Sequence, residues 1–142
     1  MFLYSEHFAA KGPNEVISCL DYYISHLPQS IKKLHIFADN CFSQNKNHYL
    51  IAHLQIIANT KLKEVHVHYP LPGHSRMPCD RDFGRIEKNR RKKDKVVKPS
   101  EWVNLIRETD RLNPFKIVFV EYSLTDDLEV MGYPSLKFKT LN

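Results

Sequence analysis

HIFADNCFSQNKN, residues 35–47, joins an apolar run to a polar patch and then to a helical pattern. The apolar run, Leu34–Ala38, ends directly in Asp39-Asn40, and the helical pattern begins near Asn47. A strand that ends in this way carries Asp39 to the carboxyl edge of a sheet, where α/β proteins usually bind their ligands. Asp39 is therefore a candidate catalytic or metal-binding carboxylate. The alternative is that Asp39-Asn40 turns the chain and caps the next helix, because both residue types are common in turns.

Strand and helix patterns alternate on both sides of this segment. Apolar spacing and Pro breaks predict helices that start near Asn14 and end at Pro28, that span Asn47–Ala58 and 79–90, and that run from a Ser100 cap to Thr109. Strands are predicted at Phe2–Tyr4, Ile31–Ala38, Leu62–Tyr69, Lys116–Tyr122 and Leu136–Thr140. The alternation indicates an α/β fold with a short mixed sheet flanked by helices. A chain of 142 residues is most simply one domain, 1–142.

Composition indicates the cellular compartment in which the chain is expected. There is no apolar run of the length that a membrane span needs, and the first residues lack the pattern of a signal peptide. The three cysteines, Cys19, Cys41 and Cys79, are far apart and have no CxxC spacing. We therefore expect reduced, buried thiols in a nuclear or cytoplasmic protein, and no membrane partner.

The positive charge is concentrated in residues 85–98, RIEKNRRKKDKVVK. This segment carries eight Lys or Arg residues against two acidic residues, whereas the rest of the chain is close to neutral. Such a segment can bind phosphate backbones, so DNA is the expected partner. The alternative is a solvated helix end. The expected contacts are Arg85, Lys88, Arg90, Arg91, Lys92 and Lys93, together with Asn40, Gln44, Asn45 and Lys46 from the loop after Asp39.

Two more carboxylates precede the basic run in GHSRMPCDRDFGRIEKN, residues 73–89. If residues 79–90 are helical, Asp80 and Glu87 lie on one face, and His74 comes shortly before them. Next to Asp39, these two acids would make a site for Mg²⁺ (or Mn²⁺) at a scissile phosphate. The alternative is that Asp80 favours the start of its helix and that Glu87 pairs with Arg91.

A weaker metal candidate is a pair of histidines, His66 and His68, which alternate along one predicted strand. They lie on the same face and could share a metal ion. Zinc sites usually have three or four protein ligands, and no third ligand is evident here. An ordinary pair of sheet-facing histidines is the favoured interpretation.

Four segments together resemble the RNase H-like, DDE-type domain of transposon-derived proteins in animal, notably arthropod, genomes, catalogued as a domain of unknown function. They are GPNEVISCL (12–20), ADNCFSQNKN (38–47), GHSRMPCDRDFGRIEKN (73–89) and NPFKIV (113–118). The resemblance implies an RNase H-like fold and Mg²⁺-dependent phosphodiester cleavage or strand transfer. It makes Asp39 the second acid of the triad, either Asp80 or Glu87 the third, and His74 an assisting residue.

One departure from that family pattern concerns the first catalytic Asp, which lies on a first strand upstream of the GPNEV segment. The chain has no Asp before Asp21, so we expect it to lack its first strands and to be catalytically incomplete. The 34–38 strand would then have an unpaired edge that invites a strand from a partner or a second copy. Three functions remain open: a nuclease or integrase domain, a non-catalytic nucleic-acid-binding module, and a protein-interaction module.

Overall fold

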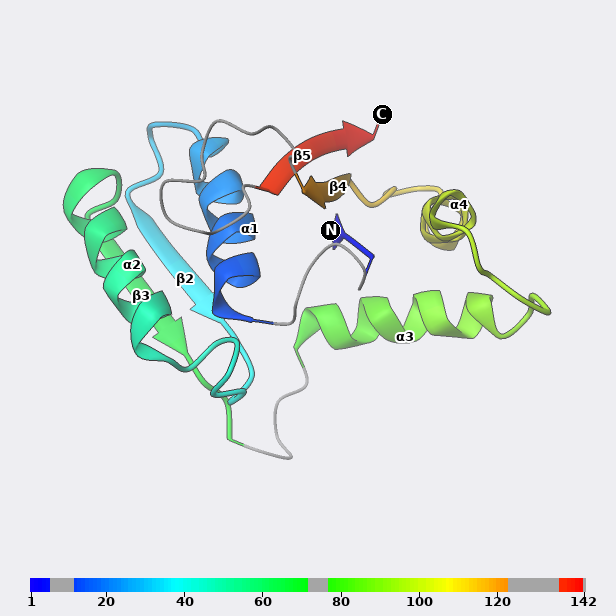
Figure 1. Cartoon of the computed structure of the whole chain (residues 1–142), viewed down its shortest axis with the longest axis horizontal. Helices are drawn as coiled ribbons and strands as arrows, with labels where there is room; N and C mark the ends of the chain where they lie inside the picture. The colour runs from blue at the N-terminus through cyan, green and yellow to red at the C-terminus, as the bar shows by residue number, and fades with distance from the viewer. Residues whose placement is uncertain (6–11, 72–76, 123–135, 142) are drawn as a thin grey trace. The chain divides into compact units, whose positions relative to one another are not determined.

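The computed structural model describes residues 1–5, 12–71, 77–122 and 136–141 (Figure 1). It has a mixed α/β composition, as the sequence predicts. The elements in chain order are β1 (Phe2–Leu3), α1 (Pro13–Ser25), β2 (Lys33–Phe37), α2 (His48–Thr60), β3 (Glu64–His68), α3 (Pro78–Arg90), α4 (Pro99–Thr109), β4 (Ile117–Tyr122) and β5 (Leu136–Leu141). The elements predicted from the sequence are all present, and their ends differ by a few residues.

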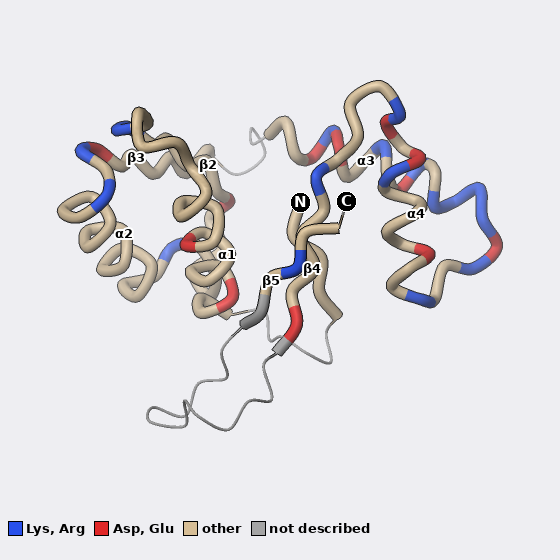
Figure 2. The backbone as a smooth tube through the Cα atoms, turned by 90° about the horizontal axis from the view of Figure 1, so that it is seen from above, with Lys and Arg blue, Asp and Glu red and all other residues tan. Residues whose placement is uncertain are grey.

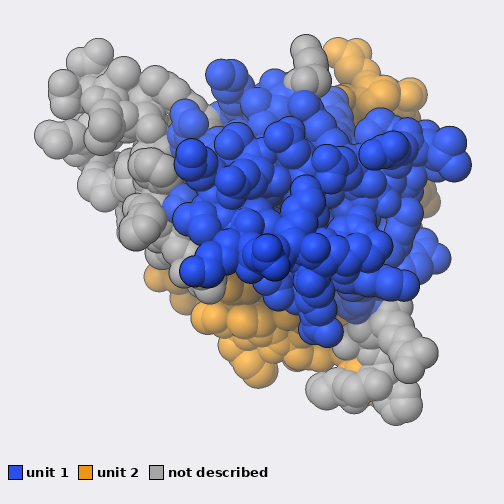
Figure 3. Space-filling model, turned by 90° about the vertical axis from the view of Figure 1, so that its right-hand side faces the viewer, with its two compact units in different colours: residues 1–8, 76–142 blue, residues 9–75 orange. Residues whose placement is uncertain are grey.

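The chain divides into two compact units, coloured separately in Figure 3. Unit 1 consists of Met1–Phe8 and Arg76–Asn142, and unit 2 is Ala9–Ser75. The described strands form two sheets, where the sequence suggested one: β1-β4-β5 belongs to unit 1 and β2-β3 to unit 2. Each unit is described by itself, and the single-domain organisation stays a prediction.

Unit 2 is a parallel β2–β3 pair with two helices on one face. The strands are in register from Lys33 opposite Glu64 to Phe37 opposite His68. Ile24 of α1 and Ile57 of α2 are both buried against Leu34 and Val65 of the two strands. Residues alternate across a strand, so the other face carries the odd-numbered β2 and even-numbered β3 side chains. Among the described strands, only β3 pairs with β2. Recruitment of a further strand at the other edge of β2 stays a prediction.

Unit 1 combines the second sheet with α3 and α4. β4 is the central strand, parallel to β1 and antiparallel to β5. The core joins Ile86 of α3 to Val103, Leu105 and Ile106 of α4 and to Ile117 of β4. Figures 1 and 2 both show that α3 and α4 cross steeply and do not run alongside each other.

Three helices begin with the same local device, a proline at the first helical position and an acidic residue two positions later. The pattern occurs as Pro13-Asn14-Glu15, Pro78-Cys79-Asp80 and Pro99-Ser100-Glu101. In each case the carboxylate accepts a hydrogen bond from the backbone N–H just before the helix, at Gly12, Met77 and Lys98, over 2.9–3.1 Å. The predicted caps Asn14 and Ser100 were therefore wrong, because proline sets the helix start one residue earlier and the acid caps it.

Two expectations drawn from the sequence concern membrane-spanning helices and the state of the cysteines. Among the described helices, none has the length and apolar character that a membrane crossing requires. All three cysteines are free, as predicted, but burial was predicted wrongly for Cys79, which is exposed in the first turn of α3. Burial raises the pKa of the Cys19 thiol to about 11, with a further contribution from the Glu15 carboxylate.

Candidate functional site

Asp39 lies two residues after Phe37, the last residue of β2, at the carboxyl end of the sheet in unit 2, as the sequence predicts. Its Oδ1 accepts hydrogen bonds from the backbone N–H of Cys41, at 3.2 Å, and from the Asn45 side-chain amide. The helix cap is a different residue: Asn47 Oδ1 accepts from the Leu50 N–H at 3.0 Å and starts α2. The carboxylate of Asp39 therefore shapes the loop that precedes the helix and does not cap the helix itself.

The amide side chains of this loop are also engaged within unit 2. Asn40 donates to the Pro70 carbonyl at 2.7 Å and accepts from Lys46 Nζ at 3.3 Å. The Tyr69 hydroxyl donates to the Asn45 carbonyl at 2.6 Å. Lys46 Nζ also lies 5.3 Å from the Phe42 ring centroid and 5.4 Å from that of Tyr69, a cation–π distance. The predicted phosphate contacts of the loop are thus occupied by intramolecular partners, and Gln44 too has a partner.

Asp80 and Glu87 both lie on α3, and the predicted helix is confirmed. Asp80 is the acid of the helix-start device, since its Oδ2 accepts from the Met77 N–H at 2.9 Å. Glu15 and Glu101 occupy the equivalent position in α1 and α4, which makes helix capping a sufficient reason for an acid at residue 80.

Glu87 is held by two arginines. Arg90 donates from Nε at 2.7 Å and from a terminal nitrogen at 2.8 Å, and Arg91 donates from Nε at 3.1 Å. The hydrogen bonds from Arg90, followed by those from Arg91, lower the pKa of the Glu87 carboxyl to about 2. The predicted Glu87–Arg91 pair is confirmed, and Arg90 is a further partner that the i+4 rule alone did not identify.

The three predicted metal ligands are divided between the two units of the chain. Asp39 belongs to unit 2, whereas Asp80 and Glu87 belong to unit 1. Both oxygens of Glu87 are already occupied by guanidinium groups. Within the described ranges, no group of three or more His, Cys, Asp or Glu side chains could hold a metal ion. His74 lies outside the described residues. A metal site formed by Asp39, Asp80 and Glu87 therefore stays a prediction.

A third histidine, His35, lies beside the predicted pair His66 and His68 and was not part of the sequence prediction. His35 of β2 lies opposite His66 of β3, with their rings stacked at 4.7 Å, and its Nδ1 is 3.0 Å from Nε2 of His68. His66 Nε2 in turn lies 3.3 Å from the Glu64 carboxylate. These His35 and His68 nitrogens lie within hydrogen-bond distance, so an N–H of one ring can donate to the ring nitrogen of the other. No signal in the sequence alone revealed His35, because its place beside His66 and His68 depends on the pairing and register of β2 and β3.

Three polar bridges connect the end of α3 and the following turn to the end of α4, all within unit 1. Arg85 contacts Asp110 at 2.9 Å, the Asn89 amide donates to the Thr109 hydroxyl at 3.1 Å, and Lys93 contacts Glu108 at 3.1 Å. Arg85, Asn89 and Lys93 are spaced four residues apart, which places them along one stripe. Four of the predicted phosphate ligands, Arg85, Arg90, Arg91 and Lys93, are therefore already in ion pairs.

The remaining lysines of the basic segment are exposed, and one of them, Lys98, lies beside the Glu101 carboxylate, which accepts a hydrogen bond from its backbone N–H. Among the described residues, none forms an ion pair with Lys88, Lys92, Lys95 or Lys98, and all four are exposed. Figure 2 shows that lysine and arginine gather at the turn from α3 to α4. Sequence reasoning included Lys88 and Lys92 as phosphate ligands but left out Lys95 and Lys98, because it stopped at the dense KNRRKK core of the run.

Taken together, the fold and the site define an α/β protein with a pair of crossing helices joined by a strongly basic turn. Residues 1–122 match the family described as Domain of unknown function (DUF7869), and the chain belongs to this family. No match is found among curated proteins or among solved structures.

Proposed function

We propose that this chain is a non-catalytic nucleic-acid-binding domain that contacts phosphates through Lys88, Lys92, Lys95 and Lys98. The observation that carries the proposal is that these four lysines are exposed and that no ion pair joins Lys88, Lys92 or Lys95 to a described acidic side chain, in a segment of local net charge +6 within an otherwise nearly neutral chain. Lys98 has the Glu101 carboxylate as a neighbour. Clustered ammonium groups repel one another, and a bound polyanion relieves this repulsion. Binding also releases the counterions of the polyanion, which favours the complex.

We further propose that the domain derives from an RNase H-like, DDE-type transposase and acts in the nucleus or cytoplasm. Support comes from the α/β order of elements, from Asp39 at the end of a parallel strand, and from the four segments that resemble that family. The capping role of Asp80 and the double arginine pairing of Glu87 favour binding over cleavage as the present activity.

Salt dependence of DNA affinity tests the binding proposal. Fluorescence anisotropy with a labelled DNA should show an affinity that falls steeply between about 50 and 200 mM salt. Replacing the four lysines by Gln should lower the slope of log affinity against log salt by about 3–4, because each lost phosphate contact contributes about one.

The matched control removes the same charge from unit 2, where four exposed lysines lie near the ends of β2 and β3. These are Lys32, Lys33, Lys61 and Lys63. Their joint replacement by Gln should leave the salt slope almost unchanged. Equal losses in the two variants would show that only overall charge matters and would overturn the assignment to the basic segment.

Substitution of Glu87 distinguishes DNA binding from DNA cleavage. Glu87→Gln weakens the hold on Arg90 and Arg91, so DNA affinity should stay the same or rise, and Asp39→Asn should leave it unchanged. A Mg²⁺-dependent nuclease would respond in the opposite way and lose its activity in both variants. Mg²⁺-dependent nicking by the native chain that disappears in Asp39→Asn would sink the non-catalytic proposal.

A further inference from the structure

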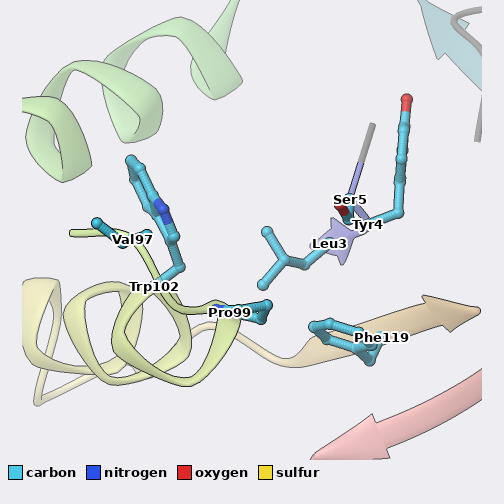
Figure 4. Close-up of a pocket in the computed structure, with 7 residues that line it drawn as sticks. All are labelled: Leu3, Tyr4, Ser5, Val97, Pro99, Trp102 and Phe119. Carbon is cyan, nitrogen blue, oxygen red and sulfur yellow. The ribbon is translucent and has the colours of Figure 1, made fainter. Parts of the chain in front are cut away.

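A cavity of about 340 Å³ lies in unit 1 beside the end of the basic segment. Figure 4 shows its lining, which comes from the first residues of the chain, from the start of α4 and from β4: Leu3, Tyr4, Ser5, Val97, Pro99, Trp102 and Phe119. The volume is at the lower end of the roughly 300–1,000 Å³ typical of ligand pockets. It therefore suits one small ring system.

The lining is aromatic and apolar, with few polar groups. Tyr4, Trp102 and Phe119 contribute rings, and the nitrogen-bearing edge of the Trp102 indole faces the open space in Figure 4. That N–H has no hydrogen-bond partner among the described residues, so it can donate to a ligand. Flat π-surfaces with one directed donor match a heteroaromatic ring better than an aliphatic chain.

The charged residues near the cavity indicate the chemical class of the ligand that supplies the ring. Val97 and Pro99 form part of the lining and flank Lys98, and Lys95 lies two residues before Val97. The Glu101 carboxylate also lies here, since it accepts hydrogen bonds from the backbone N–H groups of Val97 and Lys98. A polyanion that contacts Lys95 and Lys98 would therefore lie next to the lining of the cavity. Among polyanions, nucleic acids combine regularly spaced phosphates with flat heteroaromatic rings, and aromatic side chains stack on such bases without regard to sequence.

We propose that this cavity takes one unpaired base of a nucleic-acid strand whose phosphates contact Lys95 and Lys98. The inference rests on the proposed function, which it deepens by naming single-stranded nucleic acid as the preferred form. A base within a duplex has its edges paired and its faces stacked, so only an unpaired or extruded base can enter.

The fluorescence of Trp102, the only tryptophan of the chain, reports directly on the cavity. A short single-stranded oligothymidine should quench its emission on binding, because the base stacks on the indole. An abasic strand of the same length carries the same phosphates without bases and should bind more weakly, by at least about fivefold, without quenching. Equal affinity and equal emission for the two strands would overturn the proposal.

Two variants test the lining itself. Trp102→Leu removes a ring that also packs against the core, so its folding must be verified by circular dichroism. Val97→Asn is the safer change, because Val97 is 74% exposed, and its matched control is Leu112→Asn at a position 92% exposed and outside the lining. We expect Val97→Asn, but not Leu112→Asn, to reduce the preference for the base-containing strand over the abasic one. No difference between these two variants would argue against the cavity as a base site.

A further measurement distinguishes failure of this inference from failure of the proposed function. If the native chain binds both strands in a salt-dependent way but prefers neither, phosphate binding stands and the base site falls. If it binds neither strand, the proposed function fails, and quenching of Trp102 by free adenosine alone decides whether the cavity accepts a base. A change of emission with protein concentration in the absence of nucleic acid would assign the cavity to a second copy of the chain and overturn the proposal.

Discussion

The loop Asp39–Asn47 and the turn Arg90–Lys98 are both polar connections that lead into a helix, but they use their polar groups in opposite ways. In the loop, the carboxylate, the amides and Lys46 are directed at one another and at Pro70 and Tyr69. In the turn, lysines lie side by side, and only part of their charge is neutralised by Glu87 and Glu108. The loop uses its polar groups for folding, whereas the turn keeps charge available for a partner.

Residue type alone does not distinguish these two uses of polar groups. The loop contains the residues expected of a catalytic or phosphate-binding site, yet its hydrogen-bonding capacity is largely used within unit 2. The turn contains only a charge run, whose usual interpretation is a solvated helix end. Substitutions in the two connections should therefore act on different properties: on stability in the loop, and on ligand affinity in the turn.

Charge reversal should give the largest contrast between the two connections. Lys92→Glu combined with Lys95→Glu should weaken nucleic-acid binding at least about tenfold and lower the salt slope by about 2, because two phosphate contacts are lost. The free energy of unfolding should not fall, because the change also relieves repulsion between like charges. Anisotropy titrations and urea denaturation measure the two quantities.

Lys46→Glu is the matched change in the loop. Lys46 donates to Asn40 and lies over two aromatic rings, so its reversal should lower stability and leave the salt slope unchanged. If Lys46→Glu instead reduced DNA affinity as strongly as the double reversal in the turn, the distinction between the two connections would not hold.

The two helix starts offer a second, smaller contrast. Asn47 caps α2 with its side chain, whereas Lys98, at the equivalent position of α4, makes no side-chain cap hydrogen bond. Asn47→Ala should therefore destabilise the protein by about 1 kcal/mol. Lys98→Ala should leave stability within error, because Glu101 satisfies the backbone donors at residues 97 and 98. Urea unfolding of both variants measures the contrast, and equal losses would contradict it.

Asp39→Ala should have an effect on stability of similar size to that of Asn47→Ala. Asp39→Ala removes the acceptor for the Cys41 N–H and the Asn45 amide, and we expect a loss of about 0.5–1.5 kcal/mol. Asp39→Asn keeps an acceptor oxygen at the same place and should cost less than Asp39→Ala. Urea unfolding of the two variants measures the difference. A variant Asp39→Asn that is as unstable as Asp39→Ala would show that the negative charge itself matters, which would point to an unrecognised cation.

Local sequence signals were enough to predict most elements of the fold. Apolar periodicity located the helices and strands, and Pro78 and Pro99 marked two helix starts. The caps were misassigned because the rule applied was the Ser, Thr, Asp or Asn cap, whereas these helices use proline followed by an acid. The threefold repetition of Pro-x-acid was visible in the sequence and would have explained Asp80.

Interactions between elements could not be predicted in the same way. The position of His35 beside His68 depends on the parallel pairing and register of β2 and β3, which no local pattern specifies. The bridge from Arg85 to Asp110 likewise depends on how α4 crosses α3. The cavity around Trp102 was missed for a related reason: its lining comes from three distant parts of the chain.

The acid titration of Glu87 should give the smallest effect, and it tests whether the arginines of the turn are held as described. The paired arginines lower the pKa of Glu87 from 4.5 to about 2, so the native state should begin to lose this contribution to stability only as the pH falls from 4.5 towards 2. Above pH 4.5 the contribution is fully present, because the carboxyl is ionised in both the folded and the unfolded state. Carbon-detected NMR of the side-chain carboxyl should follow the titration.

Single arginine substitutions make this titration specific to the turn. Arg90→Gln should raise the pKa of Glu87 more than Arg91→Gln does, since Arg90 donates two of the three hydrogen bonds. Lys88→Gln, a change at a neighbour with no bond to Glu87, should shift that pKa least. A pKa near 4.5 in the native protein would mean that Arg90 and Arg91 are free in solution, and two more cations of the basic segment would then be without an ion-pair partner.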